Sequence, residues 1–189
     1  MVAAIGAIAE EGYGGASFVR ISGRASVSPG LITYHFRTKD ELIKEVLIFI
    51  HARIESSMSG GPDPTSSYLD GLSRIIVGYV QHCSRHPEEM TTLREISNAS
   101  TSAAVRDVIM EREQSGTAEL AGFLTEGQQQ RQFRPFDTTV FAGTVRAALQ
   151  VVPRQLQTLP PEQHEMYAAE LALLFVHAAA PAARHRPAR

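Results

Sequence analysis

The chain has 189 residues, 43% of them hydrophobic and 20% charged, with a formal net charge of −2 at pH 7. These values are ordinary for a globular protein with a real core, and the near-zero charge argues against a broad basic surface that holds nucleic acid by bulk electrostatics. No run approaches the ~20 apolar residues of a membrane span, and a single cysteine excludes an internal disulfide, which fits a reducing cytoplasm.

Apolar residues recur at helical spacing along most of the chain, and no good strand is found. The fold class expected is therefore all-α, with about nine helices. The first residues lack a basic region before the apolar ones, so we expect no secretory signal. The predicted helices cover residues 2–11, 18–25, 29–36, 39–57, 66–85, 87–97, 101–131, 137–157 and 160–180. Asp137 is a suitable N-cap for the eighth of them.

The second and third predicted helices are short and are joined by a tight turn at Ser26-Val27. Ser17 is a suitable N-cap for the first of the pair, and Ser28 followed by Pro29 begins the second. Two short helices around such a turn are typical of a helix-turn-helix, whose second helix lies in a DNA major groove. The pattern thus predicts a DNA-reading helix after Ser28.

A capping box, Thr38-Lys39-Asp40-Glu41, begins the next, longer helix. The strongest break in the chain follows at residues 59–64, which are rich in glycine and proline. We expect a three-helix DNA-binding domain over residues 1–45 and a C-terminal helical bundle over residues 46–180. The tail, residues 181–189, has no apolar period and is expected to be disordered.

Several short motifs in residues 1–57 together resemble one known family. They are Ala9-Glu10-Glu11-Gly12, the run Val27–Phe36 and the element Thr38–Leu42. In combination they resemble the DNA-binding domain of the tetracycline-repressor (TetR) family of bacterial transcription regulators. The resemblance covers under a third of the chain. Family members usually have glycine where this chain has Ser26, so a positive φ there would cost some strain.

The residues and the resemblance point to the same reading helix. Its N-terminus offers free N–H groups and a positive dipole end to phosphate, and Thr33 and Gly30 are the better candidates for reading bases. Lys39 is expected to bind backbone phosphate as a point charge. The residues expected to contact DNA are Ser17, Ser28, Pro29, Gly30, Thr33, Tyr34, His35 and Lys39.

Simpler interpretations exist for some of these side chains. Tyr34 and His35 could be half-buried core aromatics, and Lys39 could be a solvated first-turn residue. Residues 1–57 also hold six basic and six acidic side chains, so DNA binding has to come from local placement of donors. The joint spacing around Ser28-Pro29-Gly30 favours the DNA interpretation over each simpler one.

No motif for catalysis or for a cofactor is found, and Glu111 and Glu113 are expected to be solvated, so an enzyme is not expected. His82 and His86 are four residues apart, as metal ligands often are. No third ligand follows at a known spacing, and histidines near a helix C-terminus are favourable for dipole reasons alone. We therefore expect no metal site.

The C-terminal helices are expected to bind a small-molecule effector and to form a homodimer, both by resemblance. Aromatic, apolar and a few polar side chains are candidates for an effector pocket, and apolar stripes on the last two helices are candidates for a two-fold interface. The pocket candidates are Tyr68, Tyr79, His82, Met90, Leu93, Arg94, Phe123 and Phe141. The interface candidates are Val145, Leu149, Val152, Leu171, Leu174 and Phe175.

The function expected is a cytoplasmic transcriptional repressor that binds a palindromic double-stranded operator as a dimer and responds to a ligand. The alternative is an all-helical small-molecule binding protein whose DNA-binding domain is degenerate. The even charge balance and Ser26 favour this alternative.

Overall fold

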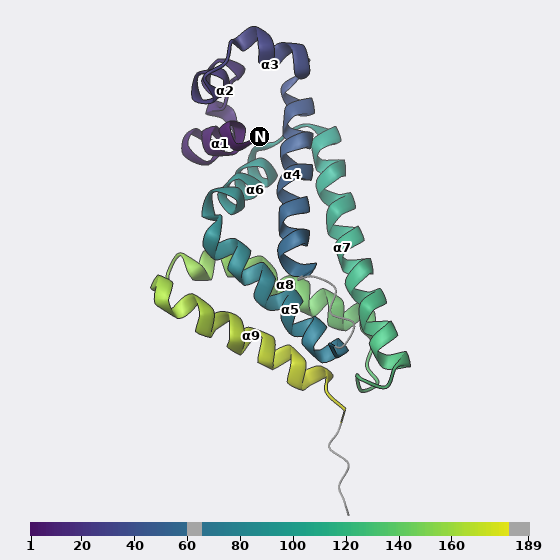
Figure 1. Cartoon of the computed structure of the whole chain (residues 1–189). Coiled ribbons are helices and arrows are strands. Elements are labelled where there is room, and N and C mark those ends of the chain that lie inside the picture. The colour runs from purple at the N-terminus through teal and green to yellow at the C-terminus, as the bar shows by residue number, and fades with distance from the viewer. Residues whose placement is uncertain (60–65, 182–189) are drawn as a thin grey trace, which may run out of the picture. The chain divides into compact units, whose positions relative to one another are not determined.

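The computed structural model describes residues 1–59 and 66–181 (Figure 1). Within these ranges the regular structure is helical, with nine α-helices and one short 3₁₀ helix, which confirms the predicted fold class. Most of the predicted break at residues 59–64 and all but the first residue of the predicted tail lie outside the described residues. The helices are α1 (Val2–Gly15), α2 (Phe18–Ala25), α3 (Pro29–His35), α4 (Lys39–Ser59), α5 (Tyr68–Arg85), α6 (Pro87–Ala99), α7 (Ala103–Gln129), α8 (Thr138–Leu156), the 3₁₀ helix η1 (Pro161–Gln163) and α9 (His164–Ala179).

Helix starts lie at the predicted capping residues. Ser17, Ser28 and Asp137 each accept a hydrogen bond from the backbone N–H three residues later, over 3.3, 3.2 and 2.9 Å respectively. Each bond satisfies one of the N–H groups that a helix leaves without an internal partner. The boundaries of α2, α3 and α8 are thus fixed by local chemistry.

The predicted capping box at the start of α4 is half formed. Thr38 Oγ1 accepts from the N–H of Glu41 at 3.2 Å, as a capping box requires. The Glu41 carboxylate accepts from the N–H of Arg37 at 2.8 Å, one residue before the cap. Both hydrogen bonds tie the link between α3 and α4 to the first turn of α4.

The chain divides into two compact units. Unit 1 contains residues 1–56 and 82–114, and unit 2 contains residues 57–81 and 115–189. Unit 1 therefore combines the predicted DNA-binding segment with most of α4, the end of α5, all of α6 and the first part of α7, whereas the sequence pattern places a domain boundary at residue 45.

The core of unit 1 is built from α1, α4 and α6. Ile8, Val46, Ile50 and Ile96 are fully buried. Helices α1 and α6 pack together, and their contact includes a buried hydrogen bond of 3.0 Å from Thr92 Oγ1 to the carbonyl of Ile5. α1 thus has a fixed support within its own unit.

The core of unit 2 is built from α5, α7, α8 and α9. Leu72, Leu124 and Val145 are fully buried in it. Neighbouring aromatic rings, with centroids 4.5 to 6.2 Å apart, add a continuous cluster. Its members are Tyr68, Phe123, Phe133, Phe136, Phe141 and Phe175.

One glycine in unit 2 is needed for close packing. A Cβ at Gly78 on α5 would lie 2.2 Å from the carbonyl oxygen of Ser57. Such a distance is far below van der Waals contact, so α5 approaches the end of α4 only because residue 78 has no side chain.

The C-terminus of α9 is capped from outside the helix. The backbone N–H of Arg134 donates to the carbonyl of Ala179 at 2.9 Å, and its Nε donates to the carbonyl of Ala178 at 2.6 Å. These carbonyls would otherwise lack helical partners, and a cation at this end also suits the helix dipole. The predicted start of this helix at Pro160-Pro161 is instead the 3₁₀ turn η1.

Candidate nucleic-acid interface

Helices α2 and α3 are joined by a turn whose geometry depends on Ser26. This residue has φ 55° and ψ 41°, which is the left-handed region that glycine adopts most readily. The turn is closed by a 3.0 Å hydrogen bond from the N–H of Val27 to the carbonyl of Ser22. Ser26 therefore has the positive φ at which a residue other than glycine costs some strain, and the turn still forms.

Helix α3 is held by its ends and exposes its sides. It has seven residues, begins at Pro29 after the Ser28 cap, and contains no buried residue. The Tyr34 side chain is 82% exposed, and the apolar side chain of Leu31 is 45% exposed. Ile32 is half-buried and the other six residues of α3 are exposed, so the helix contributes little to the core.

The exposed side chains of α3 offer both donors and apolar contacts. Thr33 Oγ1 donates to the carbonyl of Gly30 at 3.1 Å, which fixes its rotamer and leaves the oxygen able to accept. The rings of Tyr34 and His35 meet edge to face, with centroids 5.3 Å apart. Seven of the eight predicted contact residues are exposed, namely Ser17, Ser28, Pro29, Gly30, Thr33, Tyr34 and His35.

The two arginines of α2 are paired with acids of α1. Arg24 donates to both carboxylate oxygens of Glu10 at 2.6 Å, and Arg20 lies 3.4 Å from Glu11. The hydrogen bond to Arg24 lowers the pKa of Glu10, and the same bond raises the pKa of Arg24. These pairs reduce the positive charge that α2 presents, as the even charge balance of the segment predicts.

Lys39, the eighth predicted contact residue, is half-buried and engaged within the protein. Its ammonium donates to the backbone carbonyl of Tyr13 and lies 4.4 Å from the centroid of the Tyr13 ring. Burial lowers the pKa of Lys39. The side chain therefore ties the start of α4 to the end of α1, a role that the sequence pattern did not indicate.

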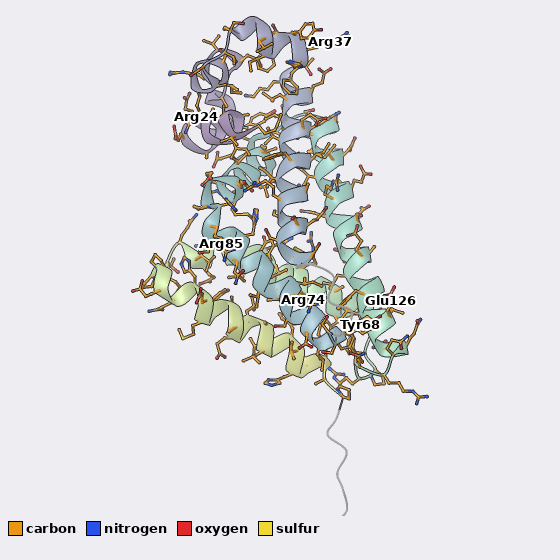
Figure 2. All side chains as sticks on the ribbon, in the orientation of Figure 1. Arg24, Arg37, Tyr68, Arg74, Arg85 and Glu126 are labelled. Atoms are coloured by element: carbon orange, nitrogen blue, oxygen red, sulfur yellow. The ribbon has the colours of Figure 1, made fainter. Side chains whose placement is uncertain are left out.

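Arg37 is a cation at this surface to which the sequence analysis assigned no role. It lies in the link between α3 and α4, and its side chain is exposed (Figure 2). The signal was visible in the sequence, since Arg37 directly follows the Val27–Phe36 motif. An exposed guanidinium beside a reading helix suits bidentate contact with phosphate.

The structure suggests different roles for Arg37 and Lys39 in DNA binding, which salt dependence can separate. Removing one phosphate-binding cation reduces the slope of log K against log salt by about 0.9. We expect Arg37→Gln to weaken binding and to reduce the slope by about that amount per protomer. We expect Lys39→Gln to weaken binding with little change of slope, because its main partner is Tyr13. Fluorescence anisotropy at four salt concentrations measures both, and a reduced slope for Lys39→Gln would restore its predicted phosphate contact.

The predicted pocket residues divide between the two units. In unit 2, Tyr68 contacts Phe123 with centroids 5.3 Å apart, and Phe141 belongs to the same aromatic cluster, while Tyr79 is half-buried. In unit 1, four candidates lie on or beside α6: Met90 and His82 are buried, Leu93 is half-buried, and Arg94 is exposed at 3.6 Å from Glu95.

The predicted interface residues of α8 face the interior of their own chain. Val145, Leu149 and Val152 are buried without any partner chain, so they cannot form the surface between two copies. Leu174 is 67% exposed, and Leu171 and Phe175 are half-buried. The outward apolar side chains of α8 and α9 are Val140, Val151, Met166, Leu173 and Leu174.

Two further features concern metal ligands and membrane-spanning helices. Among the described residues, no group of three or more His, Cys, Asp or Glu side chains is placed to hold a metal ion. Over the same residues, none of the helices has the length and apolarity to cross a membrane.

Comparison with known proteins identifies the N-terminal segment and the fold. Residues 1–46 match the model of the family described as bacterial regulatory proteins, tetR family. No curated protein matches the sequence.

Solved structures of three regulators share the fold over nearly the whole chain. A TetR transcription regulator from Haloarcula marismortui is 18% identical, with 95% of each chain covered and a TM-score of 0.78. The fatty acid degradation regulator FadR from Bacillus halodurans is 20% identical, with 93% of this chain and 95% of that chain covered and a TM-score of 0.73. The ketosteroid transcriptional regulator KstR2 of Mycobacterium tuberculosis is 16% identical, with 95% and 92% covered and a TM-score of 0.67.

Proposed function

We propose that this chain, which carries a TetR-family DNA-binding domain and has the fold of TetR-family transcriptional regulators, is a ligand-responsive repressor that binds a palindromic operator as a homodimer. The observation that carries the proposal is α3 itself. It is a capped, proline-initiated helix without a buried residue, whose Thr33, Tyr34 and His35 are all exposed. Because α3 contributes so little to the core, we infer that it binds a partner outside the chain.

Dimerisation follows from the geometry of DNA. One α3 reads only a few base pairs, whereas two copies related by a two-fold axis read two half-sites about one helical turn, roughly 34–36 Å, apart or a multiple of it. We place the interface on the outward apolar side chains of α8 and α9, among them Val151 and Leu174, which are 50% and 67% exposed. Burying such side chains between two copies would remove apolar surface from water.

The proposed effector is a largely apolar small molecule that binds in unit 2. The aromatic cluster around Phe123 and Phe141 supplies the apolar walls that such sites use. Two similar structures are of regulators named for ketosteroids and for fatty acid degradation, which makes sterols and acyl chains the first classes to test. Release of DNA would be a population shift between two dimer geometries. Nothing in this proposal requires catalysis.

The ion pairs of α2 favour the alternative proposal, a helical small-molecule binding protein that no longer binds DNA. Arg24 and Arg20 are both engaged by acids of α1, so α2 presents little positive charge. In that case the exposed residues of α3 would be without a function.

Selection of genomic DNA fragments by the purified protein separates the two proposals. At two salt concentrations we expect enrichment of a palindrome whose half-sites lie a whole number of turns apart, with weaker overall recovery at the higher salt. Recovery of fragments without a shared sequence, lost equally as salt rises, would contradict the repressor and favour the alternative.

A further inference from the structure

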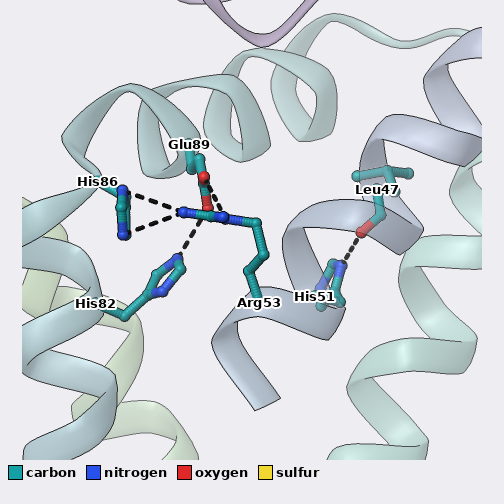
Figure 3. A network of polar contacts seen from close by, with 6 residues as sticks. All are labelled: Leu47, His51, Arg53, His82, His86 and Glu89. Carbon is teal, nitrogen blue, oxygen red and sulfur yellow. Dashed lines mark hydrogen bonds and ion pairs between the residues drawn. The ribbon is translucent and has the colours of Figure 1, made fainter. Parts of the chain in front are cut away.

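Four ionisable side chains from α4, α5 and α6 meet inside unit 1 (Figure 3). Arg53 comes from α4, His82 from α5 and Glu89 from α6, and His86 is the N-cap residue of α6. Glu89 and His82 are only 4% and 2% exposed. The proposed DNA contacts do not use these groups, and burying charge is costly unless each group has a partner.

Short polar contacts join the four groups of this network, among them an ion pair between Glu89 and Arg53. The Glu89 carboxylate lies 2.7 Å from Arg53 Nε and 3.0 Å from His82 Nε2. A carboxylate can only accept, so His82 Nε2 carries a proton. A guanidinium can only donate, so the ring of His86, 3.2 Å from Arg53 Nη2, presents an unprotonated nitrogen. When both imidazoles are neutral, Glu89 and Arg53 supply one anion and one cation, and the charges of these four groups balance.

A second proton on His82 would upset this balance. Among the charged or titratable groups that face His82 are Glu89 from α6, Arg53 from α4 and His86, whose ring centroid is 4.9 Å away. Burial lowers the pKa of His82, and the positive charge of Arg53 and the neighbouring His86 act in the same direction against Glu89. Protonated His82 would leave two cations for one buried carboxylate.

Arg53 is the cation that can leave. Its side chain is 40% exposed, whereas those of His82 and Glu89 are almost fully enclosed, at 1% and 6%. A guanidinium that swings into water recovers its hydration, and Glu89 keeps a positive partner in protonated His82. On acidification, protonated His82 would thus replace Arg53 as the positive partner of Glu89.

This exchange would act on the elements that place the reading helix. Arg53 lies on α4, which begins four residues after α3 ends. Glu89 lies on α6, which packs against α1, and α1 in turn packs against α2 and is tied to Lys39 at the start of α4. The ion pair between Arg53 and Glu89 therefore joins α6, which packs against α1, to α4, which follows α3.

We propose that this Arg53–Glu89–His82–His86 network makes operator binding sensitive to protons. At neutral pH Arg53 holds α4 to α6 through Glu89; on acidification protonated His82 replaces Arg53, α4 is released from α6, and affinity for DNA falls. The inference rests on the proposed DNA binding, and the stability of the protein gives a second, independent readout.

The sign of the stability effect follows from linkage. Because the pKa of His82 is lower in the folded protein than its ordinary value of 6.5, the unfolded chain binds more protons just below pH 6.5. Folding stability therefore rises with pH through this window and is lost as pH falls below about 6.5.

The test compares wild type with His82→Gln between pH 7.5 and 5.5 at fixed salt. Glutamine places an amide donor near the position of Nε2 and does not titrate. Anisotropy with the fragment recovered by genomic selection gives the ratio of affinities at the two pH values, and urea unfolding gives the stability of the same proteins. His51→Asn is the control for loss of another histidine of unit 1, because His51 lies on α4 and its ring bonds the Leu47 carbonyl at 2.8 Å.

We expect the ratio of the affinity at pH 7.5 to that at pH 5.5 to be about fivefold larger for wild type and His51→Asn than for His82→Gln. A factor of this size corresponds to a modest coupling between sites. We also expect their unfolding midpoints to fall more steeply. Equal pH profiles for wild type and His82→Gln in both measurements would overturn the network proposal. Absence of DNA binding by wild type at both pH values would instead overturn the proposed function and the link to the operator.

Discussion

Replacing Tyr34 by alanine is expected to reduce operator affinity by roughly 30-fold. A good bidentate contact to a base is worth about 1–3 kcal/mol. A dimer makes each contact twice, so a weaker contact of ~1 kcal/mol per protomer becomes ~2 kcal/mol in total. Because the side chain is 82% exposed, the free energy of unfolding should change by less than about 0.5 kcal/mol. Anisotropy and urea unfolding measure the two effects separately.

Met110→Ala is the control for Tyr34→Ala. Met110 is also a large exposed side chain of unit 1, at 55%, but it lies on α7. Its removal should leave both affinity and stability unchanged. If Tyr34→Ala binds the operator as wild type does, Tyr34 is not part of the interface.

Removing the guanidinium of Arg53 is expected to destabilise the protein by about 2 kcal/mol. In Arg53→Met the buried carboxylate of Glu89 would lose its positively charged partner and would keep its contact with His82. Breaking a fully buried pair costs about 3–5 kcal/mol; the lower value here reflects the 40% exposure of the Arg53 side chain. Urea unfolding at pH 7.5 measures the change.

A double variant separates the effect of charge from the effect of packing. In Arg53→Met/Glu89→Gln the buried anion is gone, and the glutamine oxygen can still accept from His82 Nε2. We expect the double variant to recover at least half of the stability that Arg53→Met loses. A double variant less stable than Arg53→Met alone would show that the charge of Glu89 is not the cause.

The parts of the fold that depend on neighbours in sequence could be predicted. Ser17, Ser28 and Asp137 cap their helices where expected, because the bond joins residues three apart. The left-handed conformation of Ser26 was suggested by the family resemblance, because members usually have glycine at this position. These features need only a few consecutive residues, so the sequence displays them directly.

Features that depend on distant residues could not be predicted. Lys39 bonds Tyr13 across 26 positions, and Glu89 bonds Arg53 of another helix. An apolar stripe shows which side of a helix avoids water but not whether its own chain or a second copy covers it. For this reason the sequence pattern predicts Val145 and Leu149 as interface residues although they are buried within the chain.

The measurement that tests the central claim most directly is a hydroxyl-radical footprint of the selected DNA fragment. If two copies of α3 read a palindrome, the footprint has two protected blocks related by a dyad, a whole number of helical turns apart, and both fade together with Tyr34→Ala. A single block, or a footprint that Tyr34→Ala leaves unchanged, would contradict it.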